Sequence, residues 1–144
     1  MGNVMLDDIL VTKMDRIELE GGDVLHGMKE SDIGYIDYGE IYFSIIKEGY
    51  TKAWKRHIRM TMNLLVPIGS VQFVFVDEQG RQREEVIGDD RYCRITVPPG
   101  IWFGFSSIVR PYSLVVNIAD IMHDKDEIER KAISSIYYPW NSIK

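Results

Sequence analysis

The stretch GYTKAWKRHIRMTMNLLVPIG, residues 49–69, decides the fold class of this chain. It opens on a glycine, continues through two segments rich in strand-forming residues, and ends in a proline and a glycine that favour a turn. Because alternate residues of a strand face the same side of a sheet, Lys55 and His57 are expected to point inward together, with Arg59 as a third member. The stretch therefore predicts β structure with cations turned toward an interior.

Short segments of the same kind continue on both sides of this stretch. The expected strands are residues 41–46, 53–62, 63–68, 71–76, 92–97, 101–107 and 113–118. Short strands at regular spacing, separated by turn residues, are typical of a sandwich or barrel. Residues 124–134 look helical instead, because three acids occupy what would be the first turn. Residues 1–144 are therefore expected to form one all-β domain, an antiparallel jelly-roll barrel with a short C-terminal helix.

Composition restricts the class of protein and its partners. The chain has 144 residues, and acids and bases are interspersed to a net charge of −5, which argues against nucleic-acid binding. Cys93 is the only cysteine, so no intrachain disulfide is possible and a reducing, cytoplasmic setting is predicted. Residues 1–12 lack the basic start of a signal peptide, and no apolar run reaches membrane-spanning length. Neither nucleic acid nor membrane is an expected partner.

The spacing of residues 49–69 resembles the first motif of the cupin superfamily, in which a glycine precedes a His-x-His pair, a glutamate and a second glycine. Here the five positions hold Gly49, Lys55, His57, Met62 and Gly69. The spacing matches the motif, whereas Lys55 and Met62 replace two metal ligands.

The second cupin motif runs Pro-x-Gly, a histidine and an asparagine, and it resembles residues 98–107 of this chain. Phe103 stands at the histidine position and Ser107 at the asparagine position. Since the superfamily needs about four His and Glu ligands and only His57 remains, no metal and no cofactor are predicted.

Within the cupins, the chain resembles the dTDP-4-dehydrorhamnose 3,5-epimerase-related, RmlC-like proteins of polysaccharide biosynthesis. The matching segments are residues 39–44, 52–57, 68–71, 97–105 and 138–140. The resemblance implies a nucleotide-diphosphate sugar as ligand and a homodimer as assembly. The strand at residues 71–76, with Phe73 and Phe75 on one face, is the expected dimer interface.

Those epimerases remove a proton beside a C4 ketone with a histidine base, stabilise the enolate with a lysine, and reprotonate with a tyrosine. Carried over by position, Lys52 is expected to hold the diphosphate, and Lys55 stands at the base position. Met62 replaces the enolate lysine, and the tyrosine position falls near Val116 or Asn117. The catalytic set is therefore predicted to be degenerate.

Any remaining catalysis is assigned to Lys55 or His57, since burial can lower the pKa of a lysine until it acts as a base. Ligand contacts are expected from Lys52, Arg59, Tyr42, Trp54 and Asn117. Trp54 either stacks on a base or sugar or belongs to the core.

Three functions stay open at this point. The first is a nucleotide-sugar epimerase or ketoisomerase that acts next to a 4-keto group. The second is a barrel that binds a nucleotide sugar or other anion without catalysis. The third is a metal-dependent cupin whose ligands lie outside both motifs.

Overall fold

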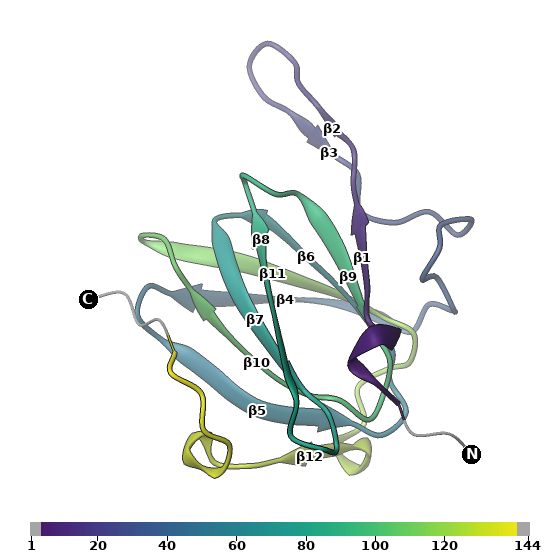
Figure 1. Cartoon of the computed structure of the whole chain (residues 1–144). Coiled ribbons are helices and arrows are strands. Elements are labelled where there is room, and N and C mark those ends of the chain that lie inside the picture. The colour runs from purple at the N-terminus through teal and green to yellow at the C-terminus, as the bar shows by residue number, and fades with distance from the viewer. Residues whose placement is uncertain (1–3, 141–144) are drawn as a thin grey trace.

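The structure is a computed structural model that describes residues 4–140 (Figure 1). Its strands are β1 (Leu10–Lys13), β2 (Arg16–Ile17), β3 (Val24–Leu25), β4 (Glu40–Lys47), β5 (Thr51–His57), β6 (Met62–Ile68), β7 (Ser70–Val76), β8 (Gln82–Gly88), β9 (Cys93–Val97), β10 (Trp102–Ser107), β11 (Tyr112–Ala119) and β12 (Ile128–Arg130). Three single 3-10 turns accompany them: η1 (Leu6–Asp8), η2 (Lys125–Glu127) and η3 (Ile133–Ser135).

Two five-stranded antiparallel sheets face each other, with strand orders β1-β9-β6-β11-β4 and β12-β5-β10-β7-β8. The hairpin of β2 and β3 projects from the end of this barrel, as Figure 1 shows. The predicted all-β antiparallel barrel is confirmed. Its strands form where β-branched and aromatic residues alternate, because one face of each strand packs into the interior.

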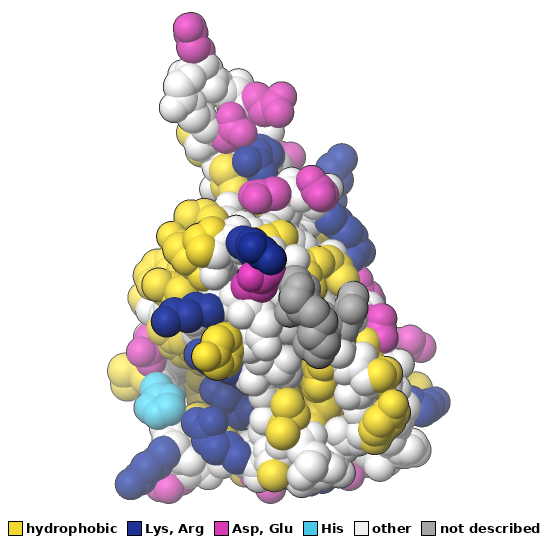
Figure 2. All heavy atoms as spheres, turned by 90° about the vertical axis from the view of Figure 1, so that its left-hand side faces the viewer, with side chains coloured by type: hydrophobic (Ala, Val, Ile, Leu, Met, Phe, Trp, Pro, Cys, Tyr) yellow, Lys and Arg dark blue, Asp and Glu magenta, His cyan; other side chains and the backbone are white. Residues whose placement is uncertain are grey.

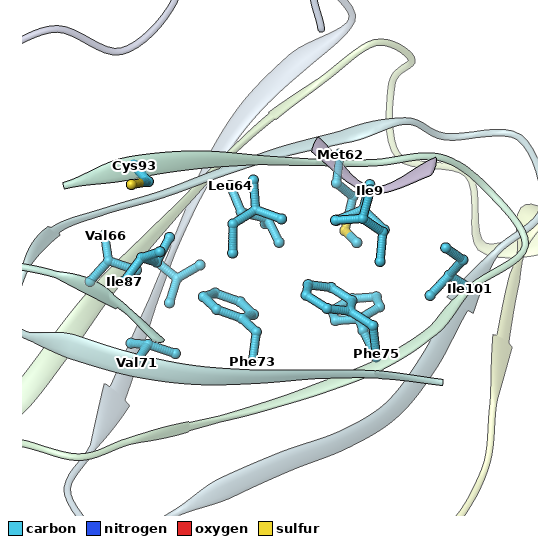
Figure 3. Close-up of a cluster of buried hydrophobic side chains, with 14 of the residues drawn as sticks. Ile9, Met62, Leu64, Val66, Val71, Phe73, Phe75, Ile87, Cys93 and Ile101 are labelled. Carbon is cyan, nitrogen blue, oxygen red and sulfur yellow. The ribbon is translucent and has the colours of Figure 1, made fainter. Parts of the chain in front are cut away.

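The core fills the space between the two sheets (Figure 3). Phe73 and Phe75 of β7 point toward Leu64 of β6 and Ile95 of β9, and neither phenylalanine is exposed to solvent. Burying such side chains stabilises the barrel by about 1.5–3 kcal/mol each. The predicted dimer interface at Phe73 and Phe75 is therefore wrong, because these rings are the centre of the core.

The C-terminal tail covers the outer face of the second sheet. Val74 and Trp102 on that face are buried under Tyr138 and Trp140, and Trp54 packs against Trp140 with ring centroids 5.5 Å apart. The Trp54 indole also donates a hydrogen bond to the Ile133 carbonyl at 3.1 Å. Strand β7 is consequently buried on both faces, which explains its nearly continuous apolar sequence.

The predicted C-terminal helix is wrong. Residues 128–130 are extended and pair with β5, and the described tail has only single 3-10 turns around them. The acids that suggested a helical first turn make separate contacts: Asp124 caps η2, Glu127 is buried, and Glu129 pairs with Arg56. These tertiary contacts outweigh the weak helical preference of the segment.

The tail's role in stability is testable at Trp54. We expect Trp54→Ala to lower the free energy of unfolding by about 3–5 kcal/mol, because a fully buried ring is lost. Trp54→Phe removes the hydrogen bond to Ile133 and part of the buried ring, so it should cost less than Trp54→Ala but more than the roughly 1 kcal/mol of the hydrogen bond alone. Urea unfolding followed by circular dichroism measures both. Tyr137→Ala is the control, since that side chain is 80% exposed; equal effects of the Trp54→Ala and Tyr137→Ala changes would contradict this account.

Candidate functional site

A cavity of about 420 Å³ opens between the two sheets beside the core. Its walls come from β4, β5, β6, β10, β11 and β12. Met62 and Phe103, which the sequence comparison aligned with the glutamate and histidine of the cupin motifs, form part of the apolar wall and leave the cavity open. The space is large enough for a small-molecule ligand.

A bulge in β5 turns two lysines into this cavity. Phe103 of β10 pairs with Lys55, whereas Phe105 pairs with Lys52, so β5 contains one more residue than β10 between these pairs. Paired residues of neighbouring strands share a face, and all four of these side chains line the cavity. Without the extra residue, lysines three positions apart would face opposite sides.

Four cations and no carboxylate line the cavity: Lys52, Lys55, Arg130 and Lys131. Arg130 of β12 lies opposite Lys55 of β5. Within residues 4–140, none of the four forms an ion pair. Burial lowers the pKa of Lys55, and the neighbouring Arg130 and Lys52 lower it further. Such a group of unpaired cations attracts an anion.

His57 is held by a buried carboxylate at the end of β5. Its Nδ1 lies 2.5 Å from Oε2 of Glu127, and both side chains are 2% exposed. The other Glu127 oxygen accepts hydrogen bonds from the backbone amides of Arg59 and Met60 at 2.9 and 3.0 Å. Glu127 directly precedes β12, whose pairing with β5 brings the carboxylate to the ring.

The protonation states follow from these surroundings. Burial lowers the pKa of His57 below its ordinary 6.5, although the Glu127 carboxylate opposes the shift. Burial pushes the pKa of Glu127 upward, but hydrogen bonds from the Arg59 amide, His57 and the Met60 amide outweigh it and leave the pKa lowered. Near pH 7 a neutral His57 therefore donates through Nδ1 to an ionised Glu127.

That tautomer leaves a lone pair on Nε2 of His57, the atom that a general base uses. Nε2 is buried and has no hydrogen-bond partner among residues 4–140. The ring stacks on Phe103, with centroids 6.1 Å apart, and Phe103 lines the cavity. The histidine is thus immediately behind the cavity wall.

A phenol lies on the β4 side of the cavity. Tyr42 and Asn117 both line it, and the Asn117 amide donates to the Tyr42 hydroxyl at 2.9 Å. Oδ1 of Asn117 accepts from the backbone amide of Asn63 at 3.1 Å, which fixes the orientation of the amide. Burial raises the pKa of Tyr42 although the Asn117 hydrogen bond opposes the shift, so the phenol is protonated near neutral pH.

The sequence and the fold of this chain were compared with those of known proteins. No protein-family model matches the sequence. The crystal structure of a dTDP sugar isomerase from Desulfovibrio desulfuricans G20 is 33% identical, covers 94% of this chain and 92% of its own, and superposes with a TM-score of 0.89. The chain belongs to the RmlC-like cupin family of dTDP-sugar epimerases and isomerases.

One further relative and one structure of the same fold are also similar to this chain. A probable low-salt glycan biosynthesis epimerase, Agl13 of Haloferax volcanii, is 28% identical over 105 residues, which are 68% of this chain and 67% of the relative. The fold is shared with QdtA, a sugar 3,4-ketoisomerase from Thermoanaerobacterium thermosaccharolyticum crystallised with TDP, at 18% identity and a TM-score of 0.76. That match covers 92% of this chain and 94% of QdtA.

The structure brings five of the seven residues predicted for the site to the cavity or its wall. Lys52, Lys55, Tyr42 and Asn117 line the cavity, and His57 lies directly behind it. Their roles in binding and catalysis stay predictions.

The structure places the other two predicted residues, Arg59 and Trp54, differently from the prediction. Arg59 lies past the end of β5, its side chain is 56% exposed and it pairs with Asp124, so its predicted inward orientation is wrong. Trp54 borders the cavity, but its indole is buried under the tail. Of the two roles considered for Trp54, packing is the one its surroundings support.

Sequence reasoning missed Glu127, Arg130 and Lys131. All three fall in the segment that was predicted to be helical. Every residue from 124 to 131 except Ile128 is charged, so no alternation of polar and apolar residues marks the strand in the sequence. In the part of the chain that the structure describes, no cluster of three His, Cys, Asp or Glu side chains is placed to hold a metal. Across residues 4–140 no helix has the length and apolar character needed to cross a membrane.

The Glu127 contacts predict a specific stability profile. Glu127→Gln should lower the free energy of unfolding by about 3 kcal/mol at pH 7, because a buried pair is broken. Since the native pKa of Glu127 lies below its ordinary 4.5, its contribution is present above pH 4.5 and is lost as pH falls through the native pKa. Urea unfolding at pH 7 and at pH 4 measures both effects. The control, Arg59→Gln, removes only an exposed pair and should cost at most about 1 kcal/mol; an equal loss in both variants would refute the assignment.

Proposed function

We propose that this chain is an isomerase of 4-keto nucleotide sugars that works by enolisation, without metal or organic cofactor. Two neighbouring features carry the proposal: four cations that form no ion pair among residues 4–140 line the cavity, and a neutral histidine held by a buried glutamate lies directly behind its wall. Unpaired cations suit the diphosphate of the ligand. A neutral imidazole with a free Nε2 suits proton abstraction beside a ketone.

The protonation state or charge of each side chain suggests its role in the proposed reaction. Nε2 of His57 takes the proton from the carbon next to the C4 carbonyl, and Glu127 stabilises the imidazolium that forms. The electron pair moves onto the ketone oxygen, where Lys55 stabilises the enolate. Tyr42 returns a proton as the acid, since its phenol is neutral and lines the cavity. The site of reprotonation decides whether the product is an epimer or a 3-keto isomer.

Family membership supports this substrate class. Relatives are named as an epimerase and as isomerases of dTDP sugars or nucleotide-linked sugars, and QdtA was crystallised with TDP. Met62 stands at the position of the lysine that stabilises the enolate in the epimerases. Met62 and Phe103 also stand at two metal-ligand positions of the cupin motifs. The proposed mechanism needs neither, because Lys55 supplies the cation and His57 retains a carboxylate partner.

A second candidate is a barrel that binds the nucleotide sugar without catalysis. Its support is the burial of His57, which is 2% exposed behind Phe103. Binding by the cations would be retained under this alternative, whereas proton abstraction would not. The two candidates therefore differ in an isotope-exchange experiment.

Enolisation is tested by NMR of dTDP-4-keto-6-deoxyglucose in deuterated water with the purified protein. We expect the C3 or C5 proton signal to disappear faster than without protein, and His57→Gln to slow the exchange by about 10²–10⁴-fold. Because the pKa of His57 is lowered, the rate should fall only when pH drops below 6.5. Lys55→Arg, which keeps the charge but cannot act as a base, should retain part of the rate. Complete loss of exchange in Lys55→Arg with no loss in His57→Gln would identify Lys55 rather than His57 as the base. No exchange with any 4-keto nucleotide sugar would instead favour a barrel that binds the ligand without catalysis.

Diphosphate recognition is tested separately by calorimetric titration with TDP. Lys52→Gln and Arg130→Gln should each weaken binding by roughly tenfold or more, since charge-assisted hydrogen bonds contribute about 1.5–3 kcal/mol. Affinity should also fall as salt is added. Lys13→Gln, at an exposed position in β1 away from the cavity, is the matched control. Unchanged affinity in both cavity variants would exclude these cations from the binding site.

A further inference from the structure

Lys55 is a cavity lysine without a polar partner in the described chain. Its side chain is half-buried, and its neighbours across the sheet are Phe103 of β10 and Arg130 of β12. Among residues 4–140 its ammonium forms no ion pair, and no hydrogen bond influences its pKa. Its Nζ is not one of the unpartnered side-chain atoms that are shielded from solvent. The amine therefore faces the open part of the cavity.

The two other lysines at the cavity have different surroundings. Lys52 is exposed to solvent. The ammonium of Lys131 lies over the ring of Trp102, 4.6 Å from its centroid, which is a cation–π contact. Of the cavity lysines in residues 4–140, only Lys55 combines a half-buried side chain with an amine that no other group contacts.

These surroundings favour the neutral, nucleophilic form of the amine. Burial lowers the pKa of Lys55 below its ordinary 10.5, and the charges of Arg130 and Lys52 lower it further. The charge of Glu127 opposes this shift without cancelling it. A lysine that is desolvated beside other cations is an activated nucleophile toward carbonyl compounds. The fraction that stays protonated retains the role proposed for it beside the enolate.

The cations around Lys55 favour a carbonyl compound that is negatively charged. Lys52 lies on the same wall because of the bulge in β5, and Arg130 lies opposite Lys55. A guanidinium binds phosphate through two parallel hydrogen bonds. Figure 2 shows Asp and Glu side chains on the projecting hairpin, whereas Lys and Arg side chains gather lower on the same face. A phosphate group is therefore the anion that best suits this site.

The remaining walls suit a small organic skeleton. The rings of Phe103 and Phe105 stack with centroids 6.5 Å apart, and Met62 and Leu64 extend the apolar wall. The cavity volume of about 420 Å³ lies in the range of small-molecule sites. Apolar walls also limit the water that would hydrolyse an imine.

We propose that Lys55 is a nucleophilic amine that forms an imine with small carbonyl compounds that carry a phosphate. The neutral Nζ attacks the carbonyl carbon. The carbonyl oxygen then takes one proton from Nζ and a second from an acid such as the Tyr42 phenol, which lines the same cavity. This oxygen leaves as water, and the new carbon–nitrogen bond becomes the double bond of a protonated imine. Nothing is oxidised or reduced, and the inference does not rest on the proposed isomerase activity.

Borohydride trapping with pyridoxal phosphate tests this inference on the full chain. The protein is incubated with the aldehyde at mildly alkaline pH, reduced with sodium borohydride, digested and mapped by mass spectrometry. We expect the pyridoxyl group on Lys55 to form at least about tenfold faster than on the exposed Lys47, because phosphate contacts contribute about 1.5–3 kcal/mol. Lys55→Arg, which keeps the charge but forms no imine, should lose this label while Lys47 keeps its own. Equal labelling rates at Lys55 and Lys47 would overturn the proposal.

Pyridoxal, which lacks the phosphate, separates recognition of the anion from reactivity of the amine. It should label Lys55 at least about tenfold more slowly than pyridoxal phosphate does, and Arg130→Gln should slow labelling by pyridoxal phosphate to a similar degree. Equal rates with the two aldehydes would overturn the requirement for a phosphate.

Lys52→Arg is the matched control on the same cavity wall. It keeps the charge beside Lys55, so the label on Lys55 should persist. Circular dichroism of each variant checks that the fold is retained. Loss of the label in a folded Lys52→Arg variant, with the label retained in Lys55→Arg, would identify Lys52 as the nucleophile and refute the assignment.

Discussion

The buried carboxylate of Glu127 is the contact on which the site depends. It accepts hydrogen bonds from the His57 ring and from the amides of Arg59 and Met60. These contacts join the segment before β12 to the end of β5. They fix the tautomer of His57, and the strand pairing that follows brings Arg130 opposite Lys55. One side chain therefore sets the position of His57 and the position of a cavity cation.

The bulge in β5 determines which side chains face the cavity. It turns Lys52 and Lys55 to the same side, so two cations of like charge lie at one wall. Trp54 between them faces outward, where the tail covers it. Burial lowers the pKa of Lys55, and the like charges of Arg130 and Lys52 lower it further. The bulge in β5 therefore has two consequences: it turns both lysines toward the cavity and it turns Trp54 toward the tail that packs over it.

Strand β4 presents different side chains on its two faces. Tyr42 and Ser44 face the cavity, whereas Phe43 and Ile45 face outward. Because the side-chain period of a strand is two residues, a slip of one residue would exchange these faces. The register with β11 therefore supports both the cavity wall and the apolar outer surface.

The strand and turn pattern was sufficient to predict an antiparallel barrel, and strand alternation was sufficient to turn Lys55 and His57 inward together, because both signals are encoded locally. The expectation for Lys52 came from the family resemblance, since alternation alone would place it on the other face from Lys55. The placement of Glu127, the bulge at Trp54 and the exposed face of β4 depended on the tertiary structure. Glu127 lies 70 residues from His57 in the chain, so only the pairing of β12 with β5 brings the two together. A one-residue bulge changes which side chains face inward without a distinct sequence signal, and the exposure of an apolar strand depends on what packs over it. The sequence by itself determined the architecture; the long-range strand pairing decided the chemistry of the site.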